Sequence, residues 1–72
     1  MTSSQQKTLL NVQALRREFG ATGNLHYLNS AARLMAFLCR SARSDKARRE
    51  FLSLADAMEL RGLSAFVVEY HG

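Results

Sequence analysis

The sequence offers neither the disulfide bonds nor the metal sites on which many small domains depend for stability. Its 72 residues include one cysteine, Cys39, so no disulfide can form within the chain. The two histidines, His26 and His71, are far from Cys39 and from each other in the sequence, which leaves no zinc-binding motif. A chain this short buries only about 60% of the surface that it exposes when unfolded. We therefore expect association with another chain to add to its stability.

Tryptophan is absent and aromatic residues are few, although 47% of the residues are apolar. This composition predicts a folded domain with a mostly aliphatic core rather than a disordered tail. Residues 1–7 lack the cationic start and apolar run of a secretory signal, and the chain has no apolar run of about eighteen residues. We expect no membrane partner. The single free thiol fits a reducing compartment, which favours a cytoplasmic location.

No pattern typical of an active site is present. Gly20 and Gly23 lack the Lys-Ser pair or the third glycine of a phosphate-binding loop. Helical spacing would place His26 nearly opposite Cys39, so the imidazole cannot serve the thiol as a general base. We expect a buried, inert Cys39 and a protein that is not an enzyme, with no catalytic residue, no cofactor and no metal.

The chain does have apolar residues at helical spacing along most of its length. This periodicity predicts one all-α domain, residues 1–72, with three main helices and a short C-terminal element. The expected ranges are 4–19, 25–42, 45–61 and 64–70. Ser3 and Gln6 fit a capping box at the first helix, Gly20 suits its end, and Asn24 suits the N-cap of the second helix.

A break in helical phase at residues 43–45 separates two helices where propensity alone would allow one. No glycine or proline lies between Ala42 and Asp45. However, the apolar stripe that includes Phe51 is rotated by about 130° from the stripe before the break. One straight helix could not bury both stripes. Ser44 as N-cap and Asp45 in the first turn therefore predict a new helix after a tight corner.

The second half of the chain is less regular. We expect Asp45 to pair with Arg49 and Lys46 with Glu50 on the exposed face of the third helix, which should end at Gly62. The segment from 63 to 72 fits either a helix or an alternating strand. A short helix capped by Ser64 is favoured, because a strand would find a partner only in a second copy of the chain.

The predicted helix 25–42 is apolar around most of its circumference. One stripe consists of Leu28, Ala31, Ala32, Met35, Leu38, Cys39 and Ala42, and a second consists of Tyr27, Leu34 and Phe37. Such a helix is normally covered from more than one side. The cover can come from the rest of the chain, or from a second copy that approaches closely over the small Ala31, Ala32 and Ala36. Both interpretations remain open at this point.

These features favour a binding protein. We expect a small stoichiometric regulator or adaptor, an inhibitor of bacterial or phage type included, that occupies a surface of a larger protein and forms a homodimer through helix 25–42 or the C-terminal segment. The candidate interface residues are Leu10, Tyr27, Leu34, Phe37, Leu52 and Leu60. Replacing Phe37 or Leu60 with Ala should then weaken association and leave helicity intact.

The alternative is a dimeric, basic regulator that binds DNA or RNA. The net charge is +4, and five of the ten Lys and Arg residues lie within ten positions, namely Arg40, Arg43, Lys46, Arg48 and Arg49. These side chains could contact phosphates. A helix-turn-helix of the phage-repressor class is disfavoured, because Glu59 stands where its turn normally has glycine and residues 65–70 offer no side chain that reads bases.

Overall fold

The computed structural model describes residues 1–72 as four helices without a strand. The helices are α1 (Ser3–Thr22), α2 (Leu25–Ser41), α3 (Asp45–Ala57) and α4 (Ser64–His71). The all-α prediction is confirmed, and the C-terminal segment is a helix rather than a strand. None of the four helices combines the length and apolar character needed to cross a bilayer.

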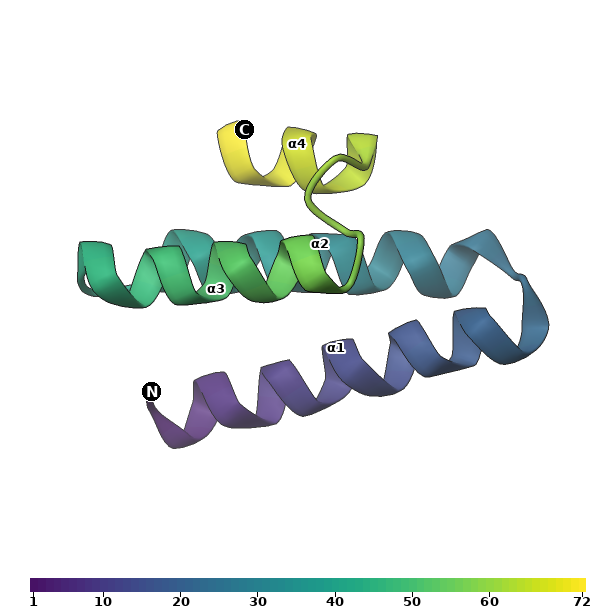
Figure 1. The fold of residues 1–72 in the computed structure, drawn as a ribbon, viewed down its shortest axis with the longest axis horizontal. Helices are drawn as coiled ribbons and strands as arrows, with labels where there is room; N and C mark the ends of the chain where they lie inside the picture. Colours follow the sequence, from purple (N-terminus) through teal and green to yellow (C-terminus); the bar gives the residue numbers. More distant parts are fainter.

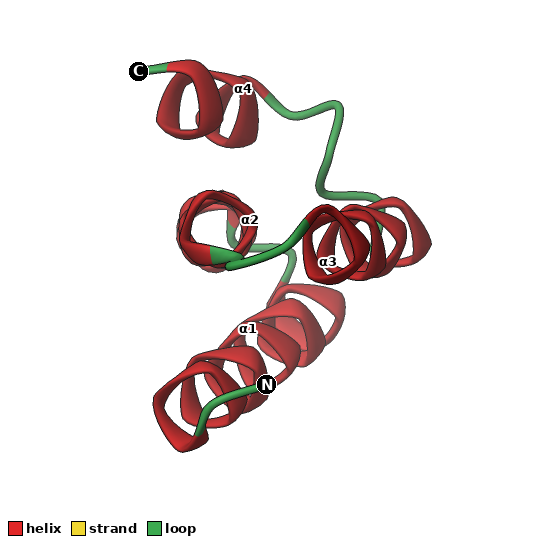
Figure 2. Cartoon of the chain, turned by 90° about the vertical axis from the view of Figure 1, so that its left-hand side faces the viewer, coloured by secondary structure: helices red, strands yellow, loops and turns green.

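Helix α2 is the centre of the molecule. It is the only helix whose backbone lies close to those of all three others. Helices α1 and α3 run antiparallel to it (Figure 1), and α1 and α4 lie on opposite sides of it (Figure 2). An apolar helix of this kind needs cover on several sides, as the sequence indicated, and here the chain supplies cover on three of them.

Helix α1 begins one residue earlier and ends three residues later than predicted, and the predicted capping box of Ser3 and Gln6 is wrong by one residue. Thr2 and Gln5 form the capping box, with Gln5 N donating to Thr2 Oγ1 at 3.1 Å and Thr2 N to Gln5 Oε1 at 3.0 Å. The helix continues through Gly20 and stops at Gly23, whose φ of 71° lies in the left-handed region. Gly23 N donates to Phe19 O at 2.7 Å, which closes the last turn.

The corner between α2 and α3 confirms the predicted phase break. Ala42 and Ser44 both have extended backbones, and Ser44 Oγ accepts a hydrogen bond from Ala47 N at 3.1 Å. The predicted cap of α2 is confirmed as well, since Asn24 Oδ1 accepts from His26 N at 2.9 Å. Two local side-chain contacts cap these helices, which explains why sequence spacing located them.

The surface pairs of α3 differ from the prediction. The Asp45 carboxylate pairs with Arg48 at 3.0 Å, one helical turn away, instead of with Arg49. Arg49 Nε donates to the backbone oxygen of Asp45 at 3.3 Å. Lys46 and Glu50 form no ion pair. Ion pairs on a helix can form at a spacing of three or of four residues, and Asp45 pairs at the spacing of three.

Helix α3 ends four residues before its predicted limit and far from Gly62. Glu59 has a φ of 60°, Glu59 N donates to Asp56 O at 3.0 Å, and Leu60 N donates to Ala55 O at 2.8 Å. These two bonds around a left-handed residue form a Schellman motif, in which glycine is the usual residue. Glu59 occupies the glycine position, so the prediction that Gly62 ends the helix is wrong.

The turn after α3 is held to α1. Arg16 Nε donates to Met58 O at 3.0 Å, and this bond satisfies a carbonyl left free where the helix stops. The chain then reaches α4, which begins after the extended Leu63 with no side-chain cap. The expected capping role of Ser64 is therefore wrong.

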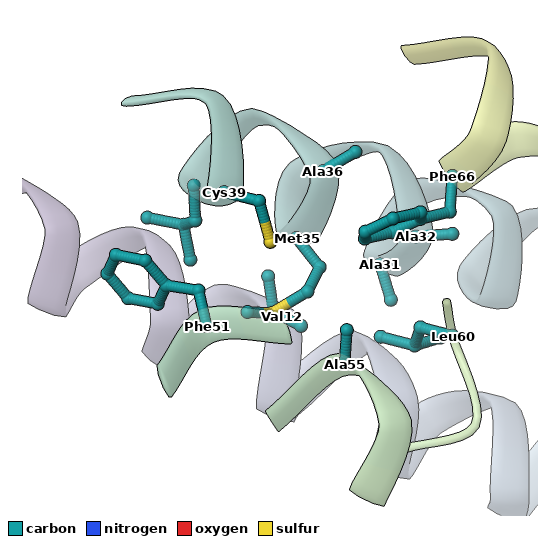
Figure 3. Packing of buried hydrophobic residues seen from close by; sticks show 11 residues of the cluster. Val12, Ala31, Ala32, Met35, Ala36, Cys39, Phe51, Ala55, Leu60 and Phe66 are labelled. Carbon is teal, nitrogen blue, oxygen red and sulfur yellow. The ribbon is translucent and has the colours of Figure 1, made fainter. Parts of the chain in front are cut away.

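The core is one cluster around α2, shown in Figure 3. Its fully buried large side chains come from several elements: Val12 from α1, Met35, Leu38 and Cys39 from α2, and Leu60 from the turn after α3. Leu9 of α1 packs against this cluster. The core is mainly aliphatic, as the composition indicated.

Small alanine side chains on α2 allow α4 to pack against it. Ala32, Ala36 and Arg40 follow one another at helical spacing, and Arg40 donates to the backbone oxygen of Glu69 on α4 at 3.1 Å. Ala32 and Ala36 are fully buried, and the ring of Phe66 from α4 lies beside Ala32 (Figure 3). The small side chains predicted to admit a neighbouring helix thus admit one from the same chain.

Candidate protein-binding surface

The six predicted interface residues do not form one surface. Leu60 is fully buried in the core and cannot reach a partner in this structure. Tyr27, Leu34 and Leu52 are half-buried. Only Leu10 and Phe37 are largely exposed, at 64% and 53%. They lie on different helices, α1 and α2, and they line no common groove.

The first surface surrounds Phe37 on the open side of α2. Arg33 and Arg40 are four residues before it and three residues after it, so both lie beside it on the helix. Arg40 also contacts α4, where its guanidinium is 3.7 Å from the Glu69 carboxylate. Val68 of α4 is 69% exposed. We call Phe37, Arg33, Arg40, Val68 and Glu69 the Phe37 face.

A groove between the two helices borders the Phe37 face, although Phe37 itself does not line it. It has a volume of about 340 Å³ and is lined by Arg33 of α2 and by Val68 and Glu69 of α4, together with Asn29, Ser64 and Ala65. Arg33 forms no ion pair. The face therefore combines exposed apolar side chains, an open depression and an uncompensated positive charge.

The second surface is on the outer side of α1. Leu10, Leu9 and Met1 line a shallow depression of about 340 Å³ with the uncharged Gln6 and Gln13. Met1 is 62% exposed. The side chains that line this patch are all uncharged, in contrast to those of the Phe37 face.

The basic segment does not converge on one anion site. Arg40 points to α4, and Arg48 pairs with Asp45. Arg43 lines a groove between the N-terminus and the start of α3, whereas Lys46 and Arg49 line a depression formed by α3 alone. The five cations thus occupy four different environments.

Cys39 has the environment of an inert thiol. It is fully buried in the core, and desolvation by burial raises the pKa of its thiol to about 11, although the nearby Arg61 and Arg48 act in the opposite direction. A thiol must ionise to act as a nucleophile. The prediction that Cys39 is a buried core residue is confirmed. His26 lies at the exposed start of α2, and no group of three metal-binding side chains comes together.

Sequence reasoning missed the exposed valines of α4. Val67 is 43% exposed, and Val68 is 69% exposed. Only Phe66 is buried on this short helix. The available signal was that apolar residues occupy more of the circumference of α4 than a single contact with α2 can cover.

The sequence matches no protein-family model, and neither a curated protein nor a solved structure matches the chain.

Proposed function

We propose that this chain is a small stoichiometric regulatory or adaptor protein that binds a larger protein through the Phe37 face. The observation that carries the proposal is the exposure of Phe37. Three helices cover α2, yet a phenylalanine in the second half of this central helix is 53% exposed. Aromatic and arginine side chains are the usual anchors of protein interfaces, and Phe37 has an arginine on each side along the helix.

The energetic contribution of Phe37 should appear in binding rather than in folding. A side chain that is already half exposed contributes little to the core, but closing a partner over it removes the rest of its apolar surface from water. Truncation of an aromatic anchor at an interface costs about 2 kcal/mol or more, which is about thirtyfold in affinity. This role requires no catalytic group.

The test is capture of a partner by tagged chain expressed in cells of the source organism, with three proteins compared: wild type, Phe37→Ala and Leu10→Ala. The two variants are matched, because each removes a large exposed apolar side chain from a helix. We expect a partner in a fixed molar ratio with wild type and Leu10→Ala, and its loss with Phe37→Ala at unchanged helicity. Loss with Leu10→Ala alone, or no partner in a fixed ratio, would contradict the proposal.

A homodimer remains a separate prediction. Light scattering over a dilution series measures it directly, and a mass equal to one chain at every concentration would exclude it. A cytoplasmic location is also part of the proposal, since a single free thiol suits a reducing compartment.

The competing hypothesis is binding of DNA or RNA through the segment from Arg40 to Arg49. It is supported by the net charge of +4 and by Arg43 and Lys46, which are exposed and form no ion pair. We place it second because these cations do not converge. If it is right, a nucleic acid complex forms at low salt, weakens steeply as salt is added, and is lost when Arg43, Arg48 and Arg49 are changed to Ala.

A further inference from the structure

The charge of the Phe37 face indicates what kind of surface it can bind. Arg33 and Arg40 flank Phe37, and both are exposed. The only carboxylate in this face is that of Glu69, which is 3.7 Å from Arg40. Arg33 has no carboxylate within ion-pair distance. The face therefore carries a net positive charge beside its apolar side chains.

The existing ion pair leaves Arg40 available to a partner. The side chains of Arg40 and Glu69 are 49% and 42% exposed, and pairs this open to water contribute at most about 1 kcal/mol. Arg40 also holds α4 by donating to the backbone oxygen of Glu69. An arginine has five N–H donors in a planar fork, so Arg40 can keep this bond and still bind an incoming carboxylate.

We propose that the Phe37 face binds an acidic peptide segment of a partner protein, which places an apolar side chain against Phe37 and Val68 and carboxylates on Arg33 and Arg40. The inference rests on the proposed function and specifies the chemistry of its partner. Carboxylates match the guanidinium fork with two parallel hydrogen bonds, which gives orientation as well as affinity.

The same charges oppose a second copy of the chain at this face. In a two-fold symmetric contact centred on Phe37, each copy would present Arg33 and Arg40 to the same surface of its partner. The contact would bring four arginines together with two carboxylates, and each carboxylate is already paired. Like charges that face one another at an interface cost several kcal/mol, whereas an acidic segment meets no such cost.

The test is selection from a display library of short random peptides on immobilised wild-type protein, after removal of peptides that bind Phe37→Ala. We expect the selected peptides to be rich in Asp and Glu around one or two apolar residues. Their affinities are then measured by fluorescence anisotropy. Arg33→Gln and Arg40→Gln should each weaken binding about tenfold or more, as expected for a hydrogen bond between charged groups, and Leu10→Ala should leave it unchanged.

Each outcome has a separate meaning. Peptides that depend on Phe37 but are not acidic would overturn the inference and leave the proposed function standing. Absence of any Phe37-dependent peptide would overturn the inference, while the capture experiment would still decide the proposed function. Displacement of the peptides by random single-stranded DNA that requires Arg33 but not Phe37 would show a nucleic acid site instead. Phe37→Ala and Arg33→Gln should keep wild-type helicity, because both side chains are exposed. Arg40→Gln also removes the hydrogen bond that holds α4, so Arg33→Gln is the cleaner of the two arginine tests.

Discussion

Replacing Leu60 with Ala should destabilise the whole domain, although Leu60 lies in a turn. Its side chain is fully buried, and its N–H closes the Schellman motif at the end of α3. A Leu→Ala change in a core costs about 2–5 kcal/mol, from the lost burial and the cavity that remains. Domains have about 0.05–0.15 kcal/mol of stability per residue, or about 4–11 kcal/mol for 72 residues. The variant should therefore lose a large part of its total stability.

Urea denaturation followed by far-ultraviolet circular dichroism measures this loss. With an m-value of about 1 kcal/mol per molar urea, the midpoint should fall by about 2 M or more. Leu10→Ala is the matched control, because the same substitution at a side chain that is 64% exposed should change stability by about 0.5 kcal/mol or less. Equal midpoints for Leu60→Ala and wild type would refute the placement of Leu60 in the core. The sequence had suggested the opposite, namely that Leu60→Ala spares the fold.

Two further predictions concern the backbone and the thiol. Glu59→Gly should raise the free energy of unfolding by about 1 kcal/mol, because it relieves a left-handed conformation at a residue with a side chain. Gly62→Ala should not lower the free energy of unfolding, since a Cβ at this position meets no atom within 4 Å. A denaturant series that shows Glu59→Gly to be destabilising would contradict this account. Cys39 holds its proton more tightly in the folded state, where desolvation by burial raises its pKa from the ordinary value of 9.0 to about 11. The stability from this shift is therefore complete below pH 9 and is lost as the pH rises towards 11, so wild type should lose more stability over that interval than Cys39→Ala, and an equal loss would be evidence against the shift.

The parts of the fold that were predictable from sequence depend on local chemistry. Asn24 and Ser44 cap helices through contacts two or three residues along the chain, and the phase break depends only on the rotation per residue. The end of α3 was not predictable in this way. A glutamate rarely adopts positive φ, so nothing in the sequence marked Glu59 as the end of the helix. The prediction therefore placed the end at Gly62, the nearest glycine.

The candidate surface was only partly predictable for a different reason. Tyr27, Leu34 and Phe37 share one helical stripe, and periodicity treats them alike. The structure leaves Phe37 exposed and half-buries the other two, because exposure depends on where neighbouring helices lie along α2. Leu60 shows the converse, since a leucine in a turn has no periodicity to report that it is buried. Tertiary packing decides both cases.

The central position of α2 also affects how the molecule can tolerate change. The other three helices all pack on α2, and the position of each depends mainly on the side of α2 that it faces. A bulkier residue in place of Ala32 or Ala36 should therefore displace α4 outward, while α1 keeps its position on the opposite side of α2 (Figure 2). Substitutions can then change the position of one helix at a time, provided that α2 keeps its small alanine side chains.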